Sequence, residues 1–209
     1  RQVVMLGAGL DTYAWRQPAT ARQSTLFFVD HPATLAATRA ALAAQERAVP
    51  GNLRFVPCDL DAQDLRDALR RQGFDAQRPA FASALGLFQY LRPDSVAAAL
   101  ATVARWAPGS EIVFSRVLPP EELDGDDLAE GRASALAPAS MDEPWLMVQR
   151  SSAWAAQLGV LAFSAIDLCA APDQQQRLFA ARLDGLSIPR FEQMVIAAVA
   201  AVARGALQG

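Results

Sequence analysis

Two glycines follow the first apolar run of the chain, and an acidic residue ends the second run. Gly7 and Gly9 come directly after the run Gln2–Leu6, in the order Gly-Ala-Gly. Glycine has no Cβ, so a backbone can turn there and approach a ligand closely. Asp30 stands about 20 residues further on, where a carboxylate can accept hydrogen bonds from ribose hydroxyls. Together these residues favour a ligand of the adenosine type.

Each of these features also has an ordinary structural interpretation. A Gly-x-Gly pair after a strand can be a tight turn, and Thr12 replaces the third glycine of the dinucleotide motif. Asp30 could also cap the helix that Pro32 begins, which is compatible with binding a ribose. Asp59 follows the third apolar run and could accept the exocyclic amine of an adenine, with Leu60 against the ring. It could equally cap the next helix.

The inventory of reactive side chains excludes several chemistries. All 19 basic residues are arginines, so a Schiff base with lysine is excluded. His31, Cys58 and Cys169 are too few for a structural zinc site with four ligands, and we expect no metal. We interpret His31 as a loop residue near the ribose rather than a general base. Two widely separated cysteines predict a reducing, cytoplasmic setting.

The net charge and the apolar runs of the sequence indicate which partners to expect. The formal net charge is −3 and the arginines are scattered, so we expect no nucleic-acid partner. The apolar run Met194–Ala203 is shorter than the ~20 residues that a membrane helix needs, so we expect no membrane span. Nothing in the sequence indicates an oligomeric state.

Short apolar runs alternate with longer alanine-rich stretches that have a helical period. Such alternation predicts an α/β fold with a mostly parallel sheet and helices on both faces. We predict a single domain over residues 1–209, with a long, lid-like loop over 118–140 that contains the acidic run Glu121–Glu130. The predicted strands are Gln2–Leu6, Thr25–Asp30, Leu53–Pro57, Ala80–Leu87, Glu111–Val117, Leu161–Leu168 and, with an ambiguous period, Phe191–Ala200. The predicted helices are Pro32–Arg47, Asp61–Arg71, Pro93–Trp106, Ser151–Leu158 and Pro172–Leu183.

Several motifs in the right order resemble one known family over nearly the whole chain. They resemble the S-adenosylmethionine-dependent methyltransferases of the leucine carboxyl methyltransferase type, which include bacterial O-methyltransferases of polyketide pathways. The motifs are VVMLGAGLDTYAWR (Val3–Arg16), FFVDHPATL (Phe27–Leu35), VPCDL (Val56–Leu60), GLFQYL (Gly86–Leu91), DEPWLM (Asp142–Met147) and FAARLDGL (Phe179–Leu186).

The resemblance implies a fold, a cofactor and a set of site residues. It implies a class I methyltransferase sheet, Rossmann-like, of seven strands with the last antiparallel. The implied cofactor is S-adenosyl-L-methionine, and the implied acceptor is a carboxylate or hydroxyl oxygen of a small molecule or peptide. The cofactor's methionine part would lie against Gly7, Ala8 and Gly9, its ribose on Asp30, and its adenine between Asp59 and Leu60. Tyr90 matches a family tyrosine on the acceptor side, and no catalytic residue is implied.

Three departures from the family pattern bear on activity. Leu85 stands where the family carries a glutamate that helps to bind the cofactor, and leucine cannot accept those hydrogen bonds. Tyr13 replaces an arginine in the glycine loop. The family also has a helical segment before its first strand, whereas this sequence begins with the strand. We therefore expect either a piece of a longer protein or a loss of part of the site.

These observations leave three hypotheses. The first is an O-methyltransferase that uses S-adenosyl-L-methionine. The second is a degenerate methyltransferase fold that binds a ligand or partner without catalysis, and Leu85 motivates it. The third, a nicotinamide-dependent oxidoreductase, lacks the third glycine that its motif requires.

Overall fold

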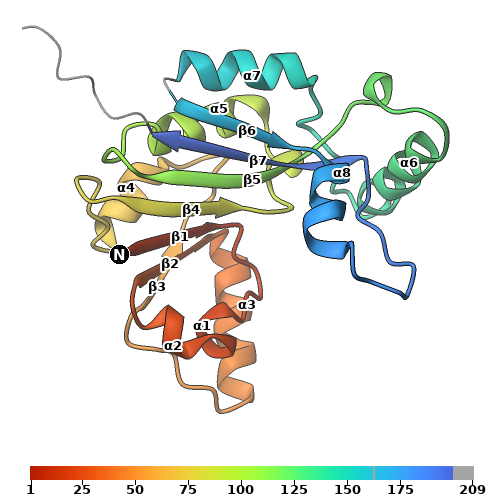
Figure 1. The fold of residues 1–209 in the computed structure, drawn as a ribbon. Coiled ribbons are helices and arrows are strands. Elements are labelled where there is room, and N and C mark those ends of the chain that lie inside the picture. The colour runs from red at the N-terminus through yellow and green to blue at the C-terminus, as the bar shows by residue number, and fades with distance from the viewer. Residues whose placement is uncertain (162, 200–209) are drawn as a thin grey trace, which may run out of the picture.

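A seven-stranded sheet forms the centre of the computed structural model, which describes residues 1–161 and 163–199 (Figure 1). The strand order is β3-β2-β1-β4-β5-β7-β6. The first five strands pair in parallel, whereas β7 is antiparallel to both β5 and β6. This arrangement confirms the predicted α/β sheet and its antiparallel last strand. The strands are β1 (Gln2–Leu6), β2 (Thr25–Asp30), β3 (Leu53–Pro57), β4 (Ala80–Ala84), β5 (Glu111–Val117), β6 (Phe163–Cys169) and β7 (Glu192–Val199).

Helices cover the two faces of the sheet unevenly. In Figure 1, α7 lies above the sheet, α5 lies behind β6, and α4 lies at the left beside β4, whereas α1, α2 and α3 lie below β1. Residues of α4, α5 and α7 all belong to one buried apolar cluster. Beyond the ends of β5 and β7, α6 and α8 extend to the right. The α-helices are α1 (Tyr13–Arg16), α2 (Pro18–Ala21), α3 (Pro32–Ala44), α4 (Leu65–Arg71), α5 (Pro93–Val103), α6 (Gly125–Ser140), α7 (Ser151–Val160) and α8 (Ala171–Gln174). Short turns η1 (Phe88–Tyr90) and η2 (Pro120–Glu122) are 3₁₀-helical, and η3 (Gln175–Phe179) is π-helical.

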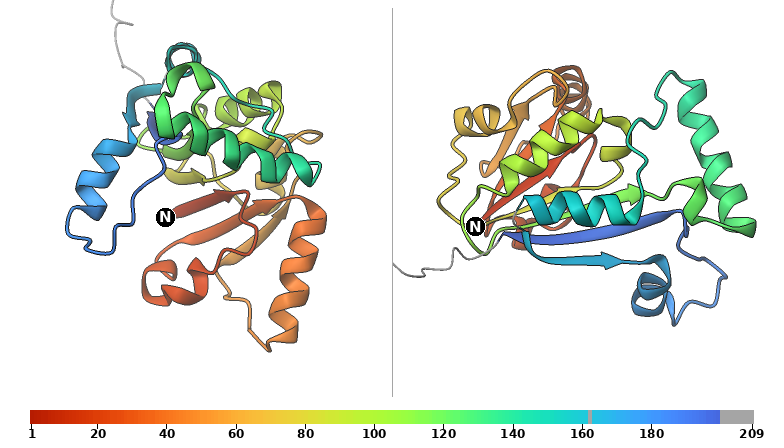
Figure 2. Two further views of the ribbon diagram at one scale, coloured as in Figure 1. Left: turned by 90° about the vertical axis from the view of Figure 1, so that its right-hand side faces the viewer. Right: turned by 90° about the horizontal axis from the view of Figure 1, so that it is seen from above.

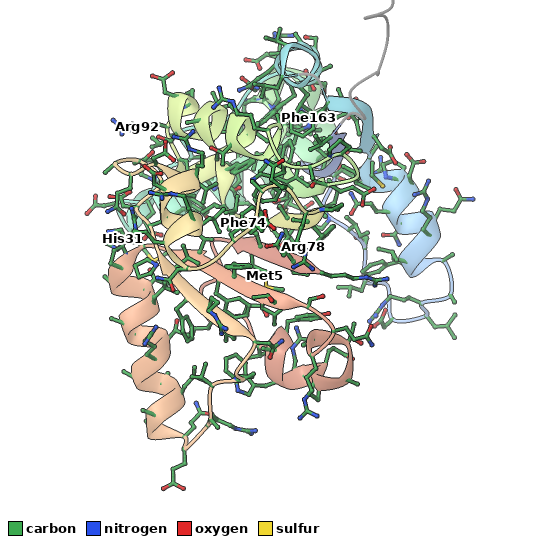
Figure 3. The ribbon with its side chains drawn as sticks, turned by 90° about the vertical axis from the view of Figure 1, so that its left-hand side faces the viewer. Met5, His31, Phe74, Arg78, Arg92 and Phe163 are labelled. Carbon is green, nitrogen blue, oxygen red and sulfur yellow. The ribbon has the colours of Figure 1, made fainter. Side chains whose placement is uncertain are left out.

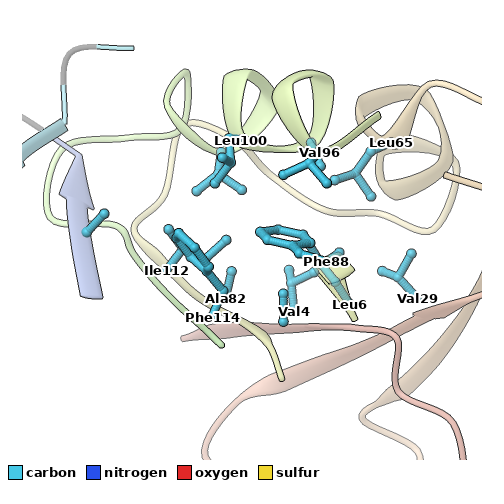
Figure 4. Close-up of a cluster of buried hydrophobic side chains, with 14 of the residues drawn as sticks. Val4, Leu6, Val29, Leu65, Ala82, Phe88, Val96, Leu100, Ile112 and Phe114 are labelled. Carbon is cyan, nitrogen blue, oxygen red and sulfur yellow. The ribbon is translucent and has the colours of Figure 1, made fainter. Parts of the chain in front are cut away.

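Two clusters of buried apolar side chains hold these layers together. The larger lies between the sheet and the helices above it, where Leu65, Val96 and Leu100 face the central strands (Figure 4). Within it, the Phe114 ring lies 5.0 Å from Trp154 of α7 and 5.1 Å from Phe88, centroid to centroid. The smaller cluster joins α1, α2 and α3 to β2 and β3. Every strand end that could carry the site is therefore fixed by packed neighbours.

Several predicted boundaries shift because local turns end the elements. The fourth strand stops at Ala84 rather than Leu87, since Gly86 has a φ of +63° and begins a turn. The helix predicted from Asp61 begins instead at Leu65, because the Asp64 carboxylate caps it and accepts a hydrogen bond from Asp67 N at 3.0 Å. The predicted helices Pro32–Arg47 and Pro93–Trp106 end about one turn earlier, while that from Ser151 runs to Val160.

The predicted loop over 118–140 is wrong in its second part. Residues Gly125–Ser140 form α6, with Asp126 and Asp127 in its first turn. Carboxylates at a helix N-terminus interact favourably with the helix dipole, and the alanines that follow are strong helix formers. The acidic run therefore marks the start of a helix.

Other differences are smaller. The predicted helix Pro172–Leu183 is a short α8 followed by the π-turn η3, and α1 and α2 were not predicted. The ambiguous run from Phe191 is strand β7. Residues 162 and 200, each inside a predicted strand, and the second part of the run Met194–Ala203 lie outside the described residues. Within the described part, no helix is both long and apolar enough to cross a membrane.

Candidate functional site

The residues singled out in the sequence meet at one edge of the sheet. Because β1, β2, β3 and β4 are parallel, their carboxyl ends lie side by side. The strand order reverses between β1 and β4, and this is where open α/β sheets bind ligands. Figure 2 (left) looks onto this edge. The structure therefore brings the predicted residues Gly7–Gly9, Asp30, Asp59–Leu60 and Leu85 to neighbouring strand ends.

The glycine loop after β1 has a backbone that requires glycine at two positions. Gly7 has a φ of +67° and Gly9 a φ of +51°, both in the left-handed region. Between them, Ala8 is buried and belongs to the smaller apolar cluster. The N–H groups of Gly7 and Ala8 donate to Val29 O at 2.9 and 3.2 Å, which ties the loop to β2.

Asp30 closes this loop from the end of β2. Its Oδ2 accepts a hydrogen bond from Gly9 N at 2.6 Å, and its Oδ1 accepts one from His31 N at 2.7 Å. A carboxylate has about four lone-pair sites, so acceptor capacity remains for a ligand hydroxyl. The alternative prediction that Asp30 caps the next helix is wrong, because the N-cap of α3 is His31.

His31 is a capping residue in this structure. Its Nδ1 accepts a hydrogen bond from Ala33 N at 3.2 Å, and Figure 3 shows the residue where α3 begins. The side chain is exposed and adjoins Asp30. A ring nitrogen that accepts from the backbone is held in one orientation, which suits a positioned loop residue better than a proton shuttle.

Thr38 is a residue of the site that the sequence did not reveal. Its hydroxyl lies 2.9 Å from Gly9 O and 3.0 Å from Thr34 O, and the residue is buried in α3. The glycine loop is thus held by β2, by Asp30 and by α3. A threonine within an alanine-rich helix was the one signal that could have pointed to it.

The loop after β3 places Asp59 and Leu60 half-buried beside Asp30. Asp59 Oδ1 accepts a hydrogen bond from Asp61 N at 3.0 Å, and Asp59 N donates to Gln63 Oε1 at 2.9 Å. The alternative that Asp59 caps the next helix is wrong, since Asp64 does so. Leu60 packs against the larger apolar cluster.

Cys58, directly before Asp59, is buried and is not a nucleophile. Burial, and next the negative charge of Asp59, raise the pKa of the Cys58 thiol to about 11. The thiol is therefore protonated at neutral pH and acts as a small apolar residue.

The loop after β4 touches the glycine loop. Gly86 N donates to Ser115 Oγ of β5 at 2.8 Å, which fixes the start of the turn. The next side chain, Leu87, lies over Gly7, because a Cβ built on Gly7 would be only 2.9 Å from Leu87 Cδ1. Leu85 is 54% exposed, and Tyr90 is half-buried in η1. The edge therefore presents an exposed leucine at the position where the resemblance implies a glutamate.

We expect Gly7→Ala to lower the free energy of unfolding by about 1–3 kcal/mol. A left-handed conformation costs an L-residue about 1–2 kcal/mol, and the new Cβ must also displace the Leu87 side chain. Urea denaturation measures the change. Gly51→Ala is the matched control, because Gly51 has an ordinary φ and open space around it. An equal loss in both variants would contradict the assigned role of Gly7.

Comparison with known proteins places this geometry in a family. The profile of the leucine carboxyl methyltransferase family matches residues 1–104, which contain the glycine loop, Asp30, Asp59 and Leu85. The chain belongs to the leucine carboxyl methyltransferase family. The cofactor of this family is S-adenosyl-L-methionine, as the resemblance implied.

The names of individual relatives agree with this family assignment. A candidate S-adenosyl-L-methionine-dependent methyltransferase of Mycobacterium tuberculosis is 43% identical over 134 residues, which are 62% of this chain and 42% of that protein. A solved candidate methyltransferase of Thermobifida fusca has a TM-score of 0.64 at 20% identity, covering 96% of this chain and 73% of that one. An O-methyltransferase family protein of Burkholderia thailandensis has a TM-score of 0.59 at 16% identity, covering 97% and 52%.

The structural matches and the sequence match support different conclusions. The two solved structures share the fold with this family member, which confirms the class I methyltransferase architecture. The matched segment spans less than half the length of the Mycobacterium tuberculosis relative. The comparisons therefore show the family and the fold of this chain.

Proposed function

We propose that this family member binds S-adenosyl-L-methionine and directs its methyl group to an oxygen atom of a small molecule or peptide. The observation that carries the proposal is the closed glycine loop, in which Asp30 accepts the N–H of Gly9 at the point where the strand order reverses. Membership of the family and the O-methyltransferase name of the Burkholderia thailandensis neighbour support it.

The residues at this edge fit such a cofactor, with one exception. At Gly9, the nearest atom to a Cβ would be Gly7 O at 4.0 Å, so the loop is open on that side. We assign the methionine part to Gly7, Ala8 and Gly9. We assign the ribose to Asp30, with His31 beside it. The exception is Leu85, whose side chain has no acceptor atom.

The adenine is assigned to the loop after β3. Asp59 can accept from an exocyclic amine through the carboxylate positions that its turn leaves free, and Leu60 offers an apolar surface for the ring. Both residues are half-buried, so a bound ring would lie partly in the protein.

The bound cofactor would supply a methyl group on a strongly electrophilic sulfonium. The chain would then hold the acceptor oxygen in line with the methyl group. Holding the reacting groups in place lowers the barrier of such displacements substantially. A carboxylate acceptor is ionised at neutral pH and needs no base, and His31 is engaged as a helix cap. Tyr90 lies in the turn after β4, and we assign it to the acceptor side.

One observation favours a second candidate function, a methyltransferase fold that binds a ligand without catalysis. Leu85 is exposed at the end of β4 and replaces a carboxylate that the family uses for the cofactor. Such a protein would keep the fold and the glycine loop but bind the cofactor weakly.

Calorimetric titration with S-adenosylhomocysteine tests the proposal. We expect one binding site per chain and a rise in melting temperature with ligand concentration, because a ligand that binds the folded state stabilises it. No heat and no thermal shift at millimolar ligand would overturn cofactor binding and favour the non-catalytic function.

A further inference from the structure

Two buried serines accept hydrogen bonds from the two ends of β4. Ser110, which directly precedes β5, is fully buried, and its Oγ accepts a hydrogen bond from Ala80 N at the start of β4, at 3.1 Å. Ser115 of β5 is 2% exposed, and its Oγ accepts one from Gly86 N, just beyond the end of β4, at 2.8 Å. Because β4 and β5 are neighbours in the sheet (Figure 1), the two serines make equivalent bonds at opposite ends of one strand pair.

One of these two bonds lies at the edge of the sheet that carries the candidate site. Ser115 comes one residue after Phe114, which pairs with Ala84, the last residue of β4. It is therefore at the carboxyl end of the strand pair, where parallel sheets bind ligands. Ser110 is at the amino end, where its hydroxyl also donates to Ala107 O at 2.6 Å. The sheet thus offers a matched serine far from the site.

The turn over residues 85–87 is held between two anchors. Gly86 has a φ of +63°, so the backbone leaves the β4–β5 ladder there. Among the described residues, the bond from Gly86 N to Ser115 Oγ is the one hydrogen bond that joins this turn to a strand. The second anchor is Phe88, whose ring is buried against Phe114. Without the Ser115 hydroxyl, the turn would keep one anchor and its Gly86 N–H would lose its acceptor.

This turn determines what lies over the glycine loop. A Cβ built on Gly7 would be 2.9 Å from Leu87 Cδ1 and 3.2 Å from Leu87 Cβ, so this leucine covers the glycine. On the other side of Gly86, Leu85 is 54% exposed at the position where the resemblance implies a glutamate that helps to bind the cofactor. A shift of Gly86 would move both leucines and change the space that we assign to the methionine part of the cofactor.

We propose that Ser115 is a positioning residue of the cofactor site. Its hydroxyl holds Gly86, and through Gly86 it sets the turn Leu85–Leu87 over the glycine loop. Ser115 is too deeply buried to contact a ligand, so it acts through the turn. A site whose parts are held in place by supporting hydrogen bonds binds its ligand more tightly, because less order must be gained on binding. The assignment rests on the proposed function.

Ser115→Ala and Ser110→Ala form the matched pair that tests this role. Each removes one buried hydroxyl and leaves a backbone N–H at one end of β4 without its acceptor, so both should lower the melting temperature. Ser110→Ala also loses the bond to Ala107 O, so its loss of stability should be at least as large. In calorimetric titration with S-adenosylhomocysteine, we expect an affinity about five- to tenfold weaker for Ser115→Ala and within about twofold for Ser110→Ala.

Ser115→Thr tests whether the hydroxyl is the group that matters. Threonine keeps a hydroxyl on the same carbon atom and is favoured in strands, so we expect an affinity within about threefold of the wild type. A folded threonine variant that binds as weakly as Ser115→Ala would overturn the role of the hydroxyl. If circular dichroism shows that this variant does not fold, the two alanine variants decide alone.

Amide hydrogen exchange in the ligand-free chain reports the turn directly. Ser115→Ala should speed the exchange of the Gly86 N–H at least about tenfold more than Ser110→Ala does, because it frees this group locally. The Ser110 variant corrects for the general loss of stability. Equal acceleration at Gly86 in both variants would show that Ser115 has no local effect on the turn, and would overturn the proposal.

The outcomes separate this role from the proposed function. If the wild type binds S-adenosylhomocysteine and both alanine variants bind it equally well, the cofactor assignment stands and the positioning role of Ser115 falls. If the wild type shows no binding at millimolar ligand, the proposed function fails, and the role of Ser115 fails with it whatever the exchange rates show.

Discussion

Asp30→Ala should lower the affinity for S-adenosylhomocysteine by at least about 100-fold, or roughly 3 kcal/mol. The carboxylate has two functions that alanine cannot replace. It accepts Gly9 N at 2.6 Å and His31 N at 2.7 Å, and so shapes both the glycine loop and the start of α3. It also offers the lone pairs that we assign to the ribose hydroxyls. Isothermal titration calorimetry measures the loss.

Two further variants separate these functions. Asp30→Asn keeps one acceptor oxygen and the size of the side chain, so we expect an intermediate loss. Asp67→Ala removes a partly exposed carboxylate of α4 that forms an ion pair with Arg70, and it should leave the affinity within about twofold. Binding by Asp30→Ala as tight as that of Asp67→Ala would show that the ligand does not use the end of β2.

Strand ends were the part of the site that the sequence could predict. The runs Gln2–Leu6, Thr25–Asp30 and Leu53–Pro57 have the same bounds in the structure as in the prediction. Buried parallel strands need nearly continuous apolar residues, and these runs end before Gly7, at Asp30 and at Pro57. Parallel pairing then brings Gly7 and Asp30 to one edge without any further information. The prediction of an adenosine-type ligand used this geometry together with the residue types of Gly7, Gly9 and Asp30 and the spacing between them.

Contacts between side chains of distant elements could not be predicted in this way. Thr38 reaches Gly9 from the inner side of α3, and Leu87 covers Gly7 from the loop after β4. Both depend on how a helix or turn packs on the sheet, which no periodicity encodes. The same limit explains α6. Its acidic start resembled a solvated loop, and its place over the end of β5 depends on the close approach at Gly131.

Leu85→Glu should raise the affinity for S-adenosylhomocysteine by about 10- to 100-fold. Leu85 is 54% exposed at the end of β4, so a carboxylate there keeps contact with water and costs little to introduce. It would restore the acceptor that the family carries, and hydrogen bonds to a charged group contribute about 1.5–3 kcal/mol. Calorimetry on the wild type and the variant, at one salt concentration, measures the gain.

Leu186→Glu separates this gain from a general effect of added charge. Leu186 is 53% exposed, nearly the same as Leu85, but it lies in the segment before β7. The same substitution there should not change the affinity. Leu85→Gln, a neutral acceptor of similar length, should give a smaller gain than glutamate. If neither acceptor at position 85 improves binding, the missing glutamate does not limit the site. If S-adenosylhomocysteine also fails to bind these variants at all, the non-catalytic function becomes the better account.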